Sequence, residues 1–133
     1  LYFNDTGLAC YLLDIESAKQ LDRDKMRGAL FENMIVMEII KHRYNQGKTG
    51  GVFFYRDSNQ NEVDILLKQE GEITALEIKS AMTYNSSFEK SLKQIPNWIN
   101  TPITNRAVIY SGDFENTNSD IKLLNYNHLG DIL

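Results

Sequence analysis

Two carboxylates and a lysine, Asp64, Glu77 and Lys79, are the residues whose types and spacing best suit hydrolytic chemistry. They lie in residues 62–79, where side chains alternate between two faces on either side of a Glu-Gly pair. Period-two alternation interrupted by an X-Gly pair is typical of a β-hairpin with a two-residue turn. The turn sets the register, and this register places Asp64 opposite Glu77 on one face.

Two carboxylates in opposed positions need an explanation. Directly opposed side chains have stems only ~5 Å apart, and like charges there destabilise a sheet. A divalent cation between Asp64 and Glu77 removes the conflict, and Mg²⁺ prefers such hard carboxylate oxygens. The same register places Glu62 opposite Lys79. The alternative is a structural ion cluster in which Lys79 bridges the two carboxylates without a metal.

A further acidic residue lies on the main predicted helix, over residues 26–44. At the helical period, Glu32 shares a stripe with apolar residues, namely Ala29, Ile35, Val36 and Ile39. A carboxylate in an apolar stripe must be paired, protonated or directed at a metal. The alternative is an ordinary solvated helix glutamate.

Several phrases together resemble a known group of proteins. Glu62-Val63-Asp64 followed by Glu77-Ile78-Lys79 resembles the PD-(D/E)xK signature of restriction endonucleases and related resolvases, with Val63 in place of the nominal proline. With these, residues 1–8 (LYFNDTGL), 28–33 (GALFEN) and 55–57 (YRD) resemble the uncharacterised C-terminal domain of many bacterial and archaeal AAA+ ATPases. The resemblance covers nearly the whole chain.

The resemblance implies an active site that depends on Mg²⁺ or Mn²⁺. Asp64, Glu77 and the backbone carbonyl of Ile78 would hold the metal, with Glu32 as a further ligand or as an orienter of water. Lys79 would orient or deprotonate the attacking water and stabilise charge on the phosphate. Phosphodiester hydrolysis of DNA is therefore the leading hypothesis. The alternative is a non-catalytic DNA-sensing or protein-docking module of the same ATPase.

Two more residues are candidate nucleic-acid contacts. Arg56 could clamp a phosphate or carboxylate, although a surface ion pair is the alternative. Gln94 and Trp98 resemble the Gln-x-x-x-Tyr element of some nucleases in this superfamily, with Trp in place of Tyr. The competing interpretation is a core Trp98 and an exposed Gln94.

The remaining elements predict an α/β fold. Strands are expected at residues 52–57, 106–111 and 121–126, and a helix capped by Ser86 should be interrupted at Pro96. The order gives a mixed central sheet of three antiparallel strands plus a crossover strand, flanked by helices. The resemblance implies that this is a restriction-endonuclease-like core.

Composition limits the class of protein. The chain has 133 residues, of which 42% are hydrophobic and 24% charged, which indicates one globular domain over residues 1–133. Within it we expect a junction segment over residues 1–24 and a core over residues 25–133, as the C-terminal fragment of a longer ATPase.

Charge and the lack of long apolar runs suggest the partners. The net charge of −4 predicts weak affinity for DNA in the isolated domain, and the lone Cys10 excludes a disulfide within the chain. No apolar run approaches the ~20 residues of a membrane span, so we expect a cytoplasmic protein without membrane contact. The resemblance implies an N-terminal ATPase module in cis, through which the protein could form oligomers.

Overall fold

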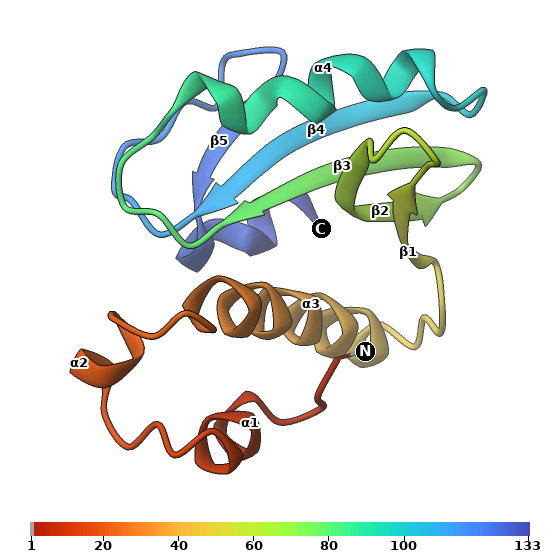
Figure 1. Ribbon diagram of the computed structural model, residues 1–133. Coiled ribbons are helices and arrows are strands. Elements are labelled where there is room, and N and C mark those ends of the chain that lie inside the picture. The colour runs from red at the N-terminus through yellow and green to blue at the C-terminus, as the bar shows by residue number, and fades with distance from the viewer. Residues whose placement is uncertain (1) are drawn as a thin grey trace. The chain divides into compact units, whose positions relative to one another are not determined.

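The structure, a computed structural model, describes residues 2–133 and consists of two compact units, Leu1–Lys48 and Thr49–Leu133. We call them the N-terminal and C-terminal units and describe each by itself (Figure 1). Leu1, which belongs to the expected junction segment, lies outside the described residues. Over residues 2–133, no helix combines the length and apolar character that crossing a membrane requires.

The N-terminal unit is helical. Its elements are α1 (Thr6–Leu12), α2 (Ala18–Leu21) and the long α3 (Arg27–Asn45), which confirms the main predicted helix to within a residue at each end. Asp5 caps α1, because its carboxylate accepts a hydrogen bond from the backbone N–H of Leu8 at 3.0 Å.

Polar side chains of α3 tie the start of the chain to this helix. The buried Asn33 accepts from the backbone N–H of Phe3 at 2.7 Å and donates to the Phe3 carbonyl and the Thr6 hydroxyl, both at 3.0 Å. The neighbouring Glu32 accepts a hydrogen bond from the Tyr2 hydroxyl at 2.7 Å. Glu32 is therefore paired within its own unit.

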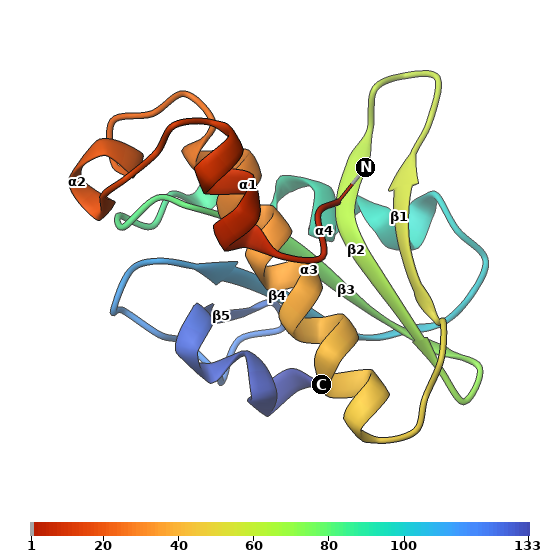
Figure 2. The same ribbon diagram turned by 90° about the horizontal axis from the view of Figure 1, so that it is seen from below.

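The C-terminal unit contains a five-stranded mixed sheet with strands in sequence order (Figure 2). The first three strands pair antiparallel, and the third, fourth and fifth pair parallel. The three antiparallel strands and the parallel crossover strand confirm the predicted mixed sheet. The strands are β1 (Val52–Arg56), β2 (Glu62–Gln69), β3 (Glu72–Lys79), β4 (Ile103–Tyr110) and β5 (Lys122–Asn125).

The β2–β3 hairpin has the predicted two-residue turn. Glu70 and Gly71 both have positive φ, 53° and 88°, as a primed turn requires. Gln69 pairs with Glu72, as predicted, and the regular register continues for five pairs away from the turn.

A β-bulge interrupts the pairing of β1 with β2. Phe53 pairs with Leu66, and the next pair is Tyr55 with Val63. Between these pairs β2 has one residue more than β1, so Asp64 and Ile65 lie opposite the single residue Phe54 and the bulge includes Asp64. Bulges turn a side chain away from its regular direction and are common beside active sites.

The bulge corrects the expected register of β1. Extrapolation from the sequence places Tyr55 opposite Asp64 and Arg56 opposite Val63, and both pairings are wrong. Tyr55 pairs with Val63 and Arg56 with Glu62, because the extra residue of β2 shifts every later pair by one.

The crossover between β3 and β4 is a chain of short helical turns, η1 (Ser86–Glu89), α4 (Lys90–Gln94) and η2 (Ile95–Asn97). The expected interruption at the proline is confirmed, since η2 begins there. The expected cap at the first serine is wrong: the Asn85 side chain accepts from the Ser87 N–H at 2.9 Å.

The crossover lies over one face of the sheet, where Figure 1 shows α4, and its apolar side chains belong to the core beneath it. Leu92 and Ile95 are fully buried, and half-buried Trp98 packs against the same core. The core continues through the strands and consists of Val63, Leu66, Ile73, Ala75, Leu92, Ile95, Val108, Tyr110, Ile121 and Leu123.

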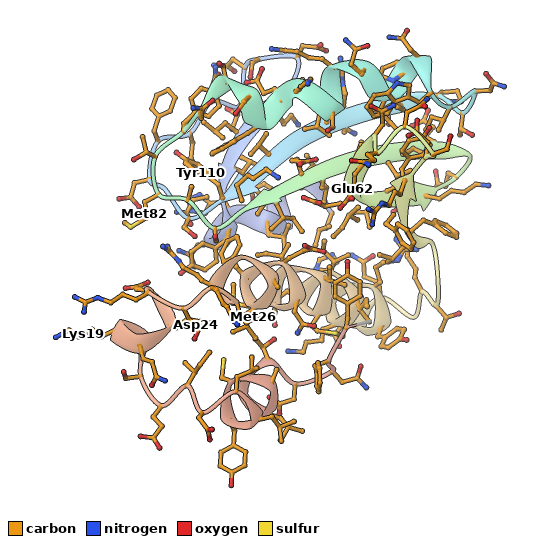
Figure 3. The ribbon with its side chains drawn as sticks, in the orientation of Figure 1. Lys19, Asp24, Met26, Glu62, Met82 and Tyr110 are labelled. Carbon is orange, nitrogen blue, oxygen red and sulfur yellow. The ribbon has the colours of Figure 1, made fainter. Side chains whose placement is uncertain are left out.

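One glycine is required by close packing at the end of β4. A Cβ on Gly112 would lie 2.1 Å from the Met82 carbonyl oxygen and 2.4 Å from the Tyr110 ring. Figure 3 labels Met82 and Tyr110 at this end of the sheet. The loop after β3 therefore passes directly over the residue that follows β4.

Candidate active site

The site begins with the face of β3 that α4 covers. Ile73 and Ala75 of β3 belong to the core under α4. Because side chains alternate along a strand, Glu77 and Lys79 are the next positions on this face. The apolar row thus ends in a carboxylate and an ammonium group.

A second carboxylate, from Asp64 of β2, lies beside these residues. The regular β2–β3 register ends at Ile65–Leu76, one step before the predicted opposition of Asp64 and Glu77. There the Asp64 carboxylate accepts a hydrogen bond from the backbone N–H of Ile78 at 2.7 Å. Asp64 is thus fixed against β3 by its side chain.

Lys79 contacts both carboxylates. Its Nζ lies 2.6 Å from Glu77 Oε1 and 3.9 Å from Asp64 Oδ2. Glu62, expected opposite Lys79, instead forms an exposed ion pair with Arg56 at 3.7 Å. Asp64, Glu77 and Lys79 therefore lie together, and Arg56 takes the surface ion pair considered as its alternative.

Glu77 is the electrostatically unusual member of this group. Its side chain is 10% exposed, and Oε2 is buried without a hydrogen-bond partner among residues 2–133. Burial, with the Asp64 charge adding to it, raises the pKa of Glu77 to about 7, against the lowering effect of Lys79. Such a carboxyl group exchanges its proton near neutral pH.

These side chains line a cavity of about 280 Å³ in the C-terminal unit. One side comes from the strands and the turn before β2, and the other from the crossover helix. Figure 3 labels Glu62 at the start of β2. The lining residues are Gln60, Asn61, Glu62, Asp64, Glu77, Lys79, Lys90, Ser91, Gln94 and Trp98.

The cavity includes both members of the Gln-x-x-x-Trp pair. Gln94 is exposed and accepts from the Asn97 amide at 3.3 Å. Trp98 is half-buried and stacks on Tyr55 with ring centroids 5.5 Å apart. Trp98 therefore packs against the core and Gln94 is exposed, and both residues also line the cavity wall. The two interpretations considered for these residues are thus compatible.

The donor set suits a hard divalent cation. Asp64 and Glu77 offer carboxylate oxygens, and the buried, unpartnered Oε2 of Glu77 needs a positively charged or hydrogen-bonding partner. Within either unit, over residues 2–133, no three His, Cys, Asp or Glu side chains are placed to hold a metal together. The roles of Glu32, in the N-terminal unit, and of the Ile78 carbonyl as further ligands stay predictions.

Sequence reasoning missed several residues of the cavity wall. Lys90 and Ser91, which open α4, were not predicted to belong to the site, and neither was the bulge at Asp64. The sequence did contain a signal for Lys90 and Ser91. Lys90, Ser91 and Gln94 lie next to one another on a helix, beside the apolar positions that pack on the sheet.

The comparisons with known proteins place the chain in a family. Residues 27–129 match the family model described as "Domain of unknown function (DUF4143)". The match covers most of the chain, so the protein belongs to this family. Neither the curated proteins nor the solved structures give a match.

Proposed function

We propose that this domain is a metal-dependent phosphodiester hydrolase that acts on DNA, with a restriction-endonuclease-like core. The observation that carries the proposal is the group of Asp64, Glu77 and Lys79 in one cavity, with Glu77 Oε2 buried and unpartnered among residues 2–133. Two acidic residues on neighbouring strands beside a lysine resemble the PD-(D/E)xK pattern, with Val63 in place of the nominal proline.

Mg²⁺, or Mn²⁺ in its place, would be held by Asp64 and Glu77, with the Ile78 carbonyl as a further ligand. When bound, the cation supplies Lewis-acid stabilisation of the negative charge on a phosphoryl oxygen. Ligation would also satisfy the buried Glu77 oxygen and favour the ionised form of this group.

The protein's own residues would act on the water and the phosphate. In hydrolysis a water oxygen bonds to phosphorus while the bond from phosphorus to the leaving sugar oxygen breaks. The water loses a proton to solvent, and the leaving oxygen gains one. Lys79 would orient the attacking water through Nζ and stabilise charge on the phosphate. Asp64, fixed by the Ile78 N–H, would keep the metal-binding carboxylates in place.

The cellular context is also a proposal. The resemblance to the C-terminal domains of AAA+ ATPases suggests an ATPase module in the same polypeptide, and assembly through that module. The net charge of −4 fits weak DNA affinity for this domain alone. A tethered ATPase would raise the local concentration of DNA at the site.

Cleavage of supercoiled plasmid in Mn²⁺ tests the proposal. The wild type should convert supercoiled plasmid to the nicked form, and Lys79→Ala should abolish nicking. Lys68→Ala is the matched control, because Lys68 is an exposed lysine on β2 beside the hairpin turn. Intact plasmid with the wild type would refute autonomous hydrolysis, and nicking by Lys79→Ala would refute the role of this lysine.

A second candidate function is a docking module for the same ATPase. Two observations favour it. Lys79 already contacts both carboxylates, which can be a structural ion cluster. Among residues 2–48, the N-terminal unit also exposes seven large apolar side chains, and exposed apolar side chains that gather on a surface mark interaction sites. They are Tyr2, Phe3, Leu8, Tyr11, Leu12, Leu13 and Tyr44.

Docking and hydrolysis predict different effects of substitutions in the exposed apolar side chains of the N-terminal unit, measured in the full-length ATPase. Docking predicts that Tyr11→Asp frees the domain from the ATPase module, seen as increased proteolysis between them. It also predicts that Lys79→Ala leaves this contact unchanged. Hydrolysis predicts loss of nicking with Lys79→Ala and no requirement for Tyr11.

A further inference from the structure

The cavity has two chemically different walls. The strand wall presents the carboxylates of Glu62, Asp64 and Glu77 beside the Lys79 ammonium group, so three negative charges face one positive charge. The opposite wall, from the start of α4, presents the Lys90 ammonium group and the Ser91 hydroxyl. A ligand that fits both walls must offer positive charge to the strands and anionic oxygens to the helix.

The donors of the helix wall are not used within the protein. Among residues 2–133, neither the Lys90 ammonium group nor the Ser91 hydroxyl has a hydrogen bond or ion pair. Lys93, on the same helix, differs: it pairs with Glu89 at 2.8 Å and does not line the cavity. Lys90 and Lys93 therefore lie on the same helix and carry the same charge, but only Lys90 lines the cavity.

Helical geometry explains why the wall is polar. Successive α-helical residues are rotated by about 100°. Leu92 and Ile95 occupy the arc that packs into the core, and both are fully buried. Ser91 falls on the arc next to Ile95, and Lys90 lies farther round the helix beside Gln94; all three of these polar residues line the cavity. Core packing therefore holds these two donors at the cavity.

We propose that Lys90, assisted by Ser91, forms a phosphate-binding subsite for the nucleic-acid backbone. This subsite rests on the proposed function, in which the carboxylates of the strand wall hold a divalent cation. With the cation neutralising the strand wall, a backbone phosphate can lie between it and Lys90. Lysine is suited to this role because its ammonium group donates up to three hydrogen bonds to phosphate oxygens.

A carboxylate ligand would also satisfy the donors, and the choice of phosphate follows from the proposed function, in which the ligand is the DNA backbone. A phosphodiester offers two anionic oxygens on one centre, so one can face the cation and the other the helix wall. The subsite contributes binding to the backbone and no base readout. Its loss should weaken all DNA sequences alike.

Binding of a short fluorescein-labelled DNA duplex in Ca²⁺, followed by fluorescence anisotropy, tests the subsite. Ca²⁺ takes the same hard oxygen ligands, so binding is measured without relying on hydrolysis. Lys90→Met should weaken binding about five- to tenfold and reduce the slope of log K against log salt by about 0.9, the value for one phosphate contact. Lys93→Met should bind within about twofold of the wild type.

The binding experiment tests the phosphate subsite independently of the proposed hydrolysis. Weaker binding by Lys90→Met alone supports the subsite, even if the wild type nicks no plasmid, in which case only hydrolysis fails. Equal losses in Lys90→Met and Lys93→Met, wild-type affinity in Lys90→Met, or no Ca²⁺-dependent binding by the wild type would overturn it. Thermal unfolding of both variants should match the wild type, since both lysines are exposed.

Discussion

Replacing the buried carboxylate of Glu77 with an amide should stabilise the metal-free protein at alkaline pH. Burial and Asp64 raise the pKa of Glu77 from the ordinary 4.5 to about 7. The folded state therefore holds this proton more tightly than the unfolded state, and the free energy of unfolding falls as pH rises from about 4.5 to about 7. Glu77→Gln resembles the protonated acid at every pH and avoids this loss.

The shift sets the size of the effect. At 1.36 kcal/mol for each pKa unit, ionising Glu77 in the folded state costs about 3 kcal/mol. Above about pH 7, Glu77→Gln should therefore be about 2–3 kcal/mol more stable than the wild type. Near pH 5 the difference should fall below about 1 kcal/mol, because little of the wild-type carboxyl is ionised.

Urea unfolding in EDTA, at about pH 5 and pH 8, measures this difference. Trp98, the single tryptophan, lies in the cavity wall and reports unfolding by its fluorescence. Glu72→Gln is the control, an exposed carboxylate at the opposite end of β3 from Glu77, and should keep the wild-type pH profile. Equal pH profiles for the wild type and Glu77→Gln would refute the argument, as would lower stability of Glu77→Gln at pH 8.

Three further predictions concern other parts of the C-terminal unit. Gly112→Ala should destabilise it by about 2–4 kcal/mol in urea unfolding, because the added methyl would overlap a backbone oxygen; wild-type stability would contradict this packing. Gly71→Ala should cost about 1 kcal/mol, because φ is 88° there, and an unchanged midpoint would refute the primed turn. The His128 ring donates a hydrogen bond to the Glu115 carboxylate at 2.9 Å, which raises the pKa of His128 above 6.5 and lowers the pKa of Glu115. The pair's contribution to stability is therefore lost as pH rises through the His128 pKa or falls through the Glu115 pKa. An NMR titration should place the His128 midpoint above 6.5 and lower it in Glu115→Gln; equal midpoints would exclude the interaction.

The sequence predicts the β2–β3 hairpin well because its information is local. Glu70 and Gly71 determine the turn, and the turn determines the pairs that follow. The parallel pairing of β3 with β4 was also predictable, since a helical crossover returns the chain in the same direction.

The bulge at Asp64 was not predictable from the same pattern. The turn between β1 and β2 is held by the Asp57 side chain, which accepts from the backbone N–H of Asn59 at 2.8 Å and of Asn61 at 2.9 Å. These contacts fix the turn without specifying which strand carries an extra residue. That choice depends on packing between strands, such as the stacking of Tyr55 on a tryptophan distant in sequence.

The candidate site shows the same division between local and distant information. Spacing alone identified Asp64, Glu77 and Lys79, because strand alternation places the latter two on one face. Lys90 was missed because its position at the cavity depends on how the crossover helix packs on the sheet. Burial of Glu77 likewise comes from the fold, and it is burial that raises its pKa.

Calorimetric titration of the protein with Mn²⁺ measures whether these carboxylates bind a metal. The wild type should show saturable binding above about pH 7, where Glu77 is ionised. Asp64→Asn should show no binding, because the amide can keep the hydrogen bond from the Ile78 N–H but lacks the charge. Heats for the wild type that equal those of buffer, or undiminished binding by Asp64→Asn, would contradict a metal site at these carboxylates.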